Sequence, residues 1–167
     1  TAYEIRNCDW SSDVCSSDLS QVKHETGGNF TTPQREKYNS SPNDPPGKPG
    51  YEYFRGYTGM NGNRNADDAY NYIGRGYLQI TGRANYADIG KRIGVDLLNN
   101  PQKLMDSDTA LDASIEYWKS RVRPNVTNWN NVFEVSRAIN KPAAVSPNEI
   151  VGMQERTQAF QIGRAHV

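Results

Sequence analysis

The amino-acid sequence predicts a mainly α-helical domain with a small β element and a long irregular loop. Four segments carry apolar residues at helical spacing, with recognisable start and stop residues. One short segment, residues 77–81, alternates between apolar and polar side chains as a strand does. Residues 39–66 are dense in Asn, Gly and Pro, which interrupt regular structure. The strand content is therefore too low for a fold built around a sheet.

Both ends of the chain are predicted to be foreign to the natural protein. Residues 1–19 and 161–167 can be back-translated into a sequencing-library adapter with a variable index in its middle. We therefore treat residues 20–160 as the natural domain, truncated at both ends, and exclude the flanks as one would exclude an expression scar. Residues 1–19 are expected to be loosely placed, and restoring the natural upstream helix is expected to improve the function of the domain.

The composition of the natural part excludes several classes of protein. Both cysteines, Cys8 and Cys15, lie in the excluded flank, so neither a disulfide framework nor a thiol nucleophile is expected. Residues 20–160 hold 17 basic and 15 acidic residues, a balance that argues against a dedicated nucleic-acid binder. No apolar run approaches the roughly 20 residues of a membrane span. We expect one monomeric domain, with neither nucleic acid nor a membrane as its partner.

The part of the domain before residue 83 is predicted to contain the end of a helix, a long loop and one short strand. Ser20–Glu25 reads as the last turns of a helix, because the glycines that follow supply the left-handed conformations that end helices. Residues 39–66 form a loop long enough to be functional or mobile. In the predicted strand Tyr77–Thr81, the two apolar side chains face the core and the others face a ligand.

Four helices complete the domain. Each has apolar residues three or four positions apart on one stripe, and the first of them ends at Gly94. The last one begins with the capping box Ser146-Pro147-Asn148-Glu149, which has proline at the first helical position. The predicted helices are residues 83–93, 108–119, 131–139 and 146–160.

Two blocks of sequence carry the chemistry. The first is His24-Glu25-Thr26-Gly27-Gly28, and the second runs from Gly74 to Tyr86 as GRGYLQITGRANY. The glycines around Arg75 also suggest a phosphate loop, but no Lys-Ser or Lys-Thr pair follows them and no βαβ unit surrounds them. They more simply allow a sharp turn of the backbone behind a cleft.

These blocks resemble glycoside hydrolase family 19, a lysozyme-like group that includes class I chitinases and many endolysins. The resemblance covers most of residues 20–160, and a further matching block is Val95-Asp96-Leu97-Leu98-Asn99-Asn100-Pro101. It implies a two-lobed helical fold and the inverting hydrolysis of β-1,4 bonds in chitin or peptidoglycan. It also implies two catalytic carboxylic acids, a polysaccharide as partner, and neither a metal nor a cofactor.

Glu25 is the candidate general acid. It stands where a helix ends in glycines, so its side chain can face an open cleft, with His24 holding its surroundings. The alternative is a helix-end glutamate that faces solvent. For the general base the resemblance favours Glu36, which follows the acid by about ten residues and comes after a proline, although it could also be a solvated charge. Glu52 and the Asp67-Asp68 pair are the other candidates.

The resemblance assigns roles to several further residues. Thr81 would position the attacking water by its hydroxyl, and Gln79 and Asn85 would hydrogen-bond the sugar. Ala84 stands where plant members have a stacking tyrosine. A stacking contact could instead come from Tyr77 or Tyr86, which could equally belong to the core, or from a platform of Tyr70 and Tyr72. Asn140 would line the cleft, although Lys141 replaces the glycine expected after it, and Arg156 would pair with the catalytic carboxylates unless it is an exposed helix arginine.

The expected substrate and biological origin depend on which members of the family this chain resembles most. A form with a short loop and without natural cysteines resembles endolysins of bacteria and phages more than plant chitinases, so peptidoglycan is favoured over chitin. The alternative from a different class is a catalytically silent carbohydrate-binding protein on the same scaffold. The ambiguous base, Ala84 and Lys141 are the residues that suggest it.

Overall fold

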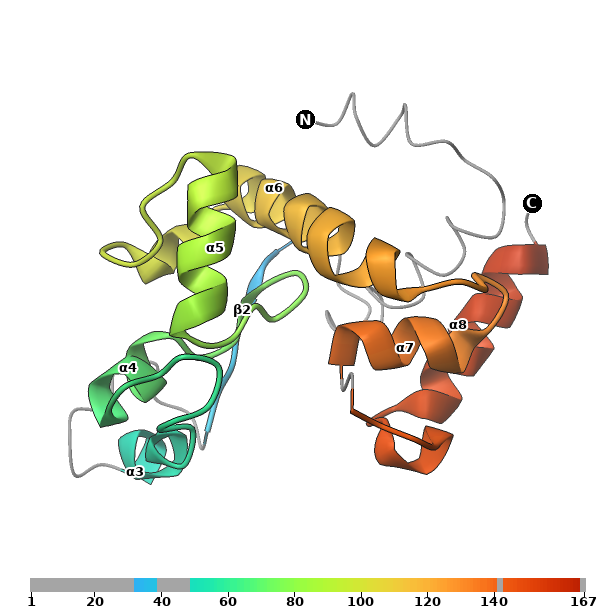
Figure 1. Cartoon of the computed structure of the whole chain (residues 1–167), viewed down its shortest axis with the longest axis horizontal. Coiled ribbons are helices and arrows are strands. Elements are labelled where there is room, and N and C mark those ends of the chain that lie inside the picture. The colour runs from blue at the N-terminus through green and yellow to red at the C-terminus, as the bar shows by residue number, and fades with distance from the viewer. Residues whose placement is uncertain (1–31, 39–48, 141–142, 166–167) are drawn as a thin grey trace. The chain divides into compact units, whose positions relative to one another are not determined.

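The computed structural model describes residues 32–38, 49–140 and 143–165 of the chain. These residues fall into two compact units, the described residues up to Glu116 (unit 2) and those from Tyr117 onwards (unit 1), which are described separately below. The described part is mainly helical, as the sequence predicts (Figure 1). Among these residues no helix is both long and apolar enough to cross a membrane. The expectations for residues 1–31, including the helix Ser20–Glu25, lie outside the described part.

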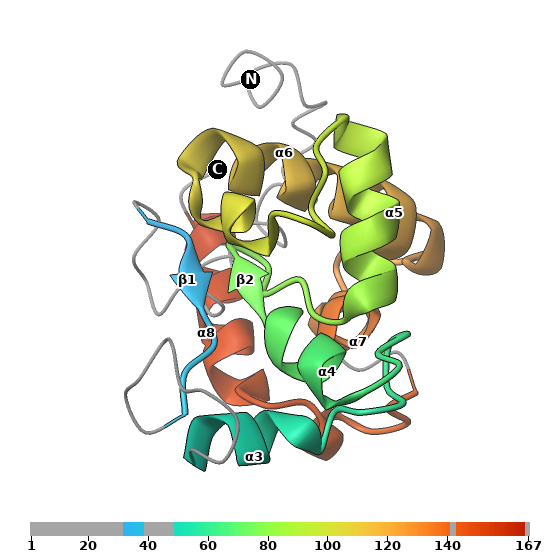
Figure 2. The same ribbon diagram turned by 90° about the vertical axis from the view of Figure 1, so that its left-hand side faces the viewer.

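Unit 2 contains a two-stranded antiparallel ribbon. Strand β1 (Gln34–Arg35) pairs with β2 (Arg75–Gly76), so that Gln34 lies opposite Gly76 and Arg35 lies opposite Arg75 (Figure 2). The pairing continues for one more step, because the Glu36 amide donates to the Gly74 carbonyl at 2.7 Å. The ribbon therefore brings residue 36 beside the glycine turn, although 38 positions separate them in the chain.

The predicted strand Tyr77–Thr81 is wrong. Residues 77–79 form a turn that folds the chain back, so that the Arg75 and Ile80 backbones exchange hydrogen bonds of 3.2 and 2.9 Å. Within this turn Gln79 takes a left-handed conformation with φ of 50°. The alternation of burial is nevertheless present, since Leu78 and Ile80 are buried and the residues between and beside them are partly exposed.

One helix lies inside the region predicted to be irregular, residues 39–66, and a second unpredicted helix begins at its end. Helix α3 spans Pro49–Arg55 and α4 spans Ala66–Asn71. Pro49 can begin α3 because a first-turn residue needs no amide hydrogen and its fixed φ already suits a helix. Asn65 caps α4 by accepting the Asp68 amide at 2.8 Å. A high content of turn residues thus delimits these short helices instead of preventing them.

Helix α5 confirms the prediction, with bounds Arg83–Ile93. It ends at Gly94, which is left-handed with φ of 71°. It starts after Gly82, which has φ of 90°, and a methyl group there would lie 2.8 Å from the Asn61 carbonyl oxygen. Gly82 is therefore required both for its conformation and for the close approach of the 61–63 segment.

Helix α6 (Ser107–Tyr117) follows the 3-10 helix η1 (Pro101–Met105) and agrees with the predicted helix 108–119 up to Tyr117. Beyond it the chain continues as a π-helix, Trp118–Val122, and a short 3-10 helix, Arg123–Asn125. The core of unit 2 is formed by buried apolar side chains of its helices and of the glycine turn, among them Phe54, Ala69, Ile73, Ile80, Tyr86, Ile89, Leu97 and Leu104.

Unit 1 contains α7 (Val132–Asn140) and α8 (Met153–Ala165), which pack against each other (Figure 1). The Glu149 carboxylate accepts the Ser146 amide at 3.1 Å, so the predicted capping box is present. It caps only the 3-10 helix Pro147–Glu149, because Ile150 is extended and Gly152 has φ of 69°. The predicted single helix 146–160 is therefore broken at residues 150–152.

Candidate active site

Glu36 lies directly after β1 and its carboxylate has two donors from unit 2. The Gly74 amide donates to Glu36 Oε2 at 3.0 Å, and the Tyr57 hydroxyl donates to Oε1 at 3.0 Å. Each carboxylate oxygen is therefore fixed by one hydrogen bond from a different segment of the chain. This excludes the alternative of a freely solvated charge for Glu36.

Three of the predicted site residues converge on Gly74. They contribute Gln79 Oε1, Glu36 Oε2 and Thr81 Oγ1. A methyl group built on Gly74 would lie 2.8 Å from the first of these oxygens and 3.2 Å from each of the other two. The missing side chain of this glycine thus makes room for a cluster of oxygen atoms, which we call the Gly74 cluster.

Hydrogen bonds to the backbone hold the other members of the cluster. Gln79 Nε2 donates to the Gln34 carbonyl at 2.9 Å and to the Gly76 carbonyl at 3.1 Å, which leaves Oε1 turned towards Gly74. The Thr81 hydroxyl donates to the Gln79 carbonyl at 2.8 Å. Asn85, in the first turn of α5, donates Nδ2 to the Thr81 carbonyl at 2.8 Å. The cluster is therefore preorganised by the ribbon, the turn and the start of α5.

Tyr57 is a site residue that the sequence did not indicate. It lies just after α3, inside the stretch whose composition predicted only a loop, and no motif singles it out. Burial and, next, the charge of Glu36 raise the pKa of Tyr57 above its ordinary value. Its hydroxyl therefore stays protonated and acts as a donor to Glu36 throughout the neutral range.

Two arginines lie side by side on the ribbon. Arg75 is buried and donates to the Asn71 carbonyl at 2.6 Å and to the Tyr86 hydroxyl at 2.9 Å. Burial and the facing charge of Arg75 lower the pKa of Arg35. The ribbon thus carries two adjacent positive charges, and one of them, Arg35, directly precedes Glu36 in the chain.

Tyr72 and Tyr86 belong to the core. The Tyr72 hydroxyl donates to the Leu98 carbonyl at 3.0 Å, and the Tyr86 hydroxyl donates to the Ile73 carbonyl at 2.7 Å. Burial raises the pKa of Tyr86 to about 12. The two rings pack against each other with centroids 5.2 Å apart. Stacking on a sugar would require exposed rings, so the structure favours the core interpretation that was open for Tyr86. It also buries Tyr72, one half of the predicted platform of Tyr70 and Tyr72, whereas Tyr70 is partly exposed.

The other candidate bases take part in structural contacts. Exposed Glu52 pairs with Arg55 at 2.9 Å. Asp67 accepts the Tyr51 hydroxyl at 2.5 Å. Asp68 is buried and binds Arg64 at 2.7 Å, and the hydrogen bonds from Arg64 lower the pKa of Asp68. Glu36 is the carboxylate of this group that joins Gln79 and Thr81.

The remaining predicted residues are placed less completely. Glu25 and His24 lie outside the described residues, and so does the side chain of Asn140, whose backbone ends α7. Arg156 in α8 is only 1% exposed, so the alternative of an exposed helix arginine is wrong. Its Nε donates to the Val151 carbonyl at 3.1 Å.

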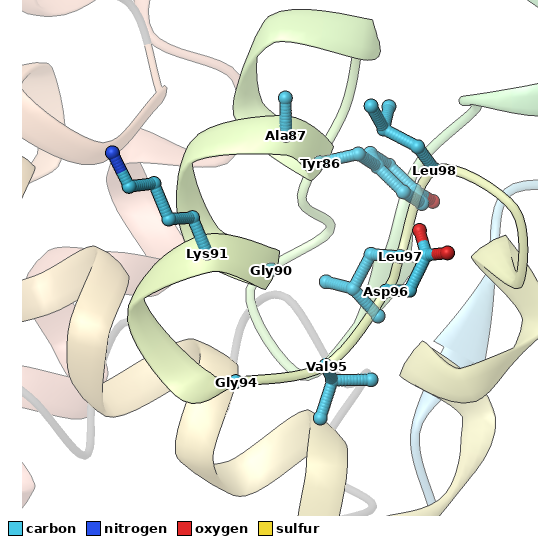
Figure 3. Close-up of a pocket in the computed structure, with 9 residues that line it drawn as sticks. All are labelled: Tyr86, Ala87, Gly90, Lys91, Gly94, Val95, Asp96, Leu97 and Leu98. Carbon is cyan, nitrogen blue, oxygen red and sulfur yellow. The ribbon is translucent and has the colours of Figure 1, made fainter.

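A hollow of about 320 Å³ lies between α5 and the segment that follows it (Figure 3). Its lining includes Lys91 and Asp96, but neither Glu36 nor the other members of the Gly74 cluster. The Asp96 carboxylate accepts the Asn99 side-chain amide at 2.6 Å and the Asn99 backbone amide at 3.1 Å. This hollow has no second carboxylate and does not carry the predicted chemistry. Within residues 32–38, 49–140 and 143–165, no group of three or more His, Cys, Asp and Glu side chains could hold a metal ion.

Two curated proteins illustrate what part of this chain is similar to. A Haemophilus influenzae protein described as containing a glycosyl hydrolase family 19 domain is 35% identical over 81 residues, which cover 48% of this chain and 38% of that protein. Endochitinase 2 of Gossypium hirsutum is 33% identical over 108 residues, which cover 60% of this chain and 32% of the plant protein. The chain therefore spans about a third of the length of these relatives.

Solved structures show the same fold at low sequence identity. Chitinase C of Streptomyces griseus has a TM-score of 0.65 and 23% identity, with 93% of this chain and 61% of that chain covered. A bacterial family 19 chitinase has a TM-score of 0.65 and 24% identity, with 92% and 73% covered. The family model described as class I chitinase matches residues 11–144. With more than half of its length matched, the chain belongs to glycoside hydrolase family 19.

Proposed function

We propose that this domain hydrolyses β-1,4 glycosidic bonds in polymers of the N-acetylglucosamine type, with Glu36 as general base. The observation that carries the proposal is the Gly74 cluster. In it, a carboxylate oxygen, an amide oxygen and a hydroxyl oxygen all lie close to Gly74, and the carboxylate is held by two hydrogen-bond donors. A carboxylate fixed beside further polar atoms suits the capture and deprotonation of a water molecule.

The proposed mechanism uses two carboxyl groups. Glu25 gives its proton to the glycosidic oxygen as the bond from that oxygen to the anomeric carbon breaks. Glu36 takes a proton from a water molecule whose oxygen bonds to the anomeric carbon from the opposite face. The configuration at this carbon is therefore inverted, and the two carboxyl groups must stand about 6.5 to 9.5 Å apart.

Family membership supports the reaction class, and the two candidate substrate polymers are chitin and peptidoglycan. The plant relatives are named endochitinases, which makes chitin one candidate. The absence of cysteines from residues 20–160 favours a peptidoglycan-degrading endolysin. Both polymers present β-1,4-linked N-acetylglucosamine-type rings, so the same acid and base serve either one.

The test compares the chain with its Glu25→Gln and Glu36→Gln variants. Turnover is measured on chitin oligomers and on purified bacterial cell walls, and the anomer first released is identified by NMR. Both substitutions are expected to remove nearly all turnover while the circular dichroism spectrum is unchanged. Undiminished activity of Glu36→Gln would overturn the assignment of the base, and retention of configuration would overturn the inverting mechanism.

The same experiment separates an enzyme from a carbohydrate-binding protein on this scaffold. Ala84, which is exposed at the start of α5, is the described feature that favours the binding protein. Affinity for the oligomers without any product would support that alternative. Robust cleavage of chitin with inert cell walls would assign chitin as the substrate.

A further inference from the structure

We propose that Tyr53 and Tyr38 form a sugar-binding platform that extends the candidate active site along α3. The platform would hold a ring of the glycan beyond the bond that is cleaved, and the proposal rests on the hydrolase function given above. The sequence singled out neither residue as a candidate site residue.

The two rings are arranged as a flat, open pair. Their centroids are 4.4 Å apart and their planes differ by 4°. Tyr53 is 48% exposed, although most large apolar side chains of unit 2 are buried, and Tyr38 is partly exposed. In a parallel pair each ring has one face that its partner does not cover. The pair therefore offers aromatic surface to solvent in a fixed orientation.

This pair is joined to Glu36 by Tyr57. The Tyr57 ring meets the Tyr53 ring at 67°, with centroids 6.1 Å apart, and its hydroxyl donates to Glu36 Oε1. The Tyr53 hydroxyl contributes to the raised pKa of Tyr57, after burial and the charge of Glu36. Tyr38 is also only two residues from Glu36 in the chain. A continuous row of tyrosines therefore leads from the candidate base to the open pair.

The chemistry of the row suits a sugar. One face of a pyranose ring presents C–H groups, which are attracted to the negatively charged face of an aromatic ring. The hydroxyl groups around the sugar need polar neighbours, and the exposed Glu52–Arg55 pair lies on the same helix as Tyr53. A single exposed aromatic residue is ordinary on a protein surface. This pair, however, is ordered and is connected through Tyr57 to the candidate base Glu36. Its most suitable ligand is therefore the glycan on which Glu36 is proposed to act.

The test measures binding to inactive protein, so that turnover does not interfere. Affinities for a hexasaccharide and a disaccharide, from chitin and from peptidoglycan glycan strands, are determined by calorimetry in the Glu36→Gln background. Tyr53→Ala is expected to weaken hexasaccharide binding about tenfold and to reduce the preference for the longer ligand. Tyr53→Phe keeps the ring and is expected to retain most of the affinity. Met60→Ala removes an equally exposed apolar side chain and serves as the matched control, with no change expected.

The outcomes distinguish this proposal from the function on which it rests. Hexasaccharide binding that Tyr53→Ala leaves unchanged would overturn the platform and leave the hydrolase function standing. Failure of every oligosaccharide to bind would instead count against the proposed function. An equal loss of affinity in Tyr53→Ala and Met60→Ala, with unchanged circular dichroism spectra, would also overturn the platform, because the effect would not depend on the aromatic pair.

Discussion

At the scale of single residues, Glu36 depends on neighbours that differ in kind. Gly74 contributes a backbone amide that most substitutions would keep, whereas Tyr57 contributes a side-chain hydroxyl that one substitution removes. A hydrogen bond to a charged group contributes about 1.5–3 kcal/mol, and more is lost when the remaining group is left badly oriented. Tyr57 is therefore the residue through which the orientation of Glu36 can be tested without changing Glu36.

We predict that Tyr57→Phe lowers kcat about tenfold or more and changes KM little. The ring would still pack against Phe54, so the thermal midpoint should move by only a few degrees. Steady-state kinetics on chitohexaose measures both constants. Tyr51→Phe removes a hydroxyl from α3 that binds Asp67, and it is the control for which unchanged kcat is expected. Equal kcat in the two variants would show that Tyr57 does not position Glu36.

At the scale of elements, the short helices of unit 2 are held by local polar contacts. The Asp68 carboxylate accepts the Arg64 amide at 3.0 Å and Arg64 Nε at 2.7 Å, and its other charged neighbour is Arg83 at 3.7 Å. Since Asp68 lies in the first turn of α4, its negative charge also suits the helix dipole. This network fixes α4 to the start of α5 and so supports the glycine turn between them.

The lowered pKa of Asp68 predicts a pH-dependent contribution to stability. A depressed folded-state pKa stabilises the fold above the unfolded-state value of about 3.9, and this contribution is lost as the pH falls through the lower folded-state value. Asp68→Asn should therefore lower the thermal midpoint at pH 7 by about 2–5 °C, and the difference from wild type should shrink below about pH 4. Thermal denaturation at several pH values tests this. Asp106→Asn, in an exposed pair with Lys103, should have little effect at any pH.

The sequence was most informative where an element follows one periodic rule. Helix α5 matches its predicted bounds, because an apolar stripe and a glycine stop agree. The strand predicted at residues 77–81 failed because a turn whose alternate side chains are buried produces the same pattern as a strand. Helices α3 and α4 were missed because each is only six or seven residues long and depends on a proline start or an asparagine cap more than on periodicity.

The candidate site was also predictable only in part. Glu36, Gln79 and Thr81 could be named because a family resemblance supplied their roles, and the ribbon then brings them together around Gly74. Tyr57 could not be named, since its role arises from a contact between residues 21 positions apart in a segment without a pattern. The burial of Tyr72 was likewise decided by packing, which sequence spacing does not encode.

At the scale of the whole molecule, charge does not direct the choice of partner. Residues 20–160, which we treat as the natural domain, hold 17 basic and 15 acidic residues, so the net charge is close to balanced. A balanced charge provides no long-range steering of a ligand. Recognition of an uncharged glycan should then depend on short-range contacts in the candidate site.

We therefore predict that kcat/KM on chitohexaose changes less than about twofold between about 0.05 and 0.3 M salt, a range over which exposed charges become strongly screened. Initial rates at fixed pH measure this directly. A steep fall with rising salt on this uncharged substrate would show that surface charges contribute to binding or turnover, and it would overturn the prediction.

In the Gly74 cluster every polar side-chain hydrogen is already used in a hydrogen bond to the backbone. The hydrogens of the Gln79 amide are taken by two carbonyls, and the hydroxyl hydrogen of Thr81 is taken by a third. The Glu36 carboxylate is itself an acceptor. All three oxygens around this point thus offer lone pairs and no hydrogens. A water molecule held against these oxygens would donate its hydrogens to them, and its own lone pairs would then point away from the cluster, where an electron-poor carbon can receive them.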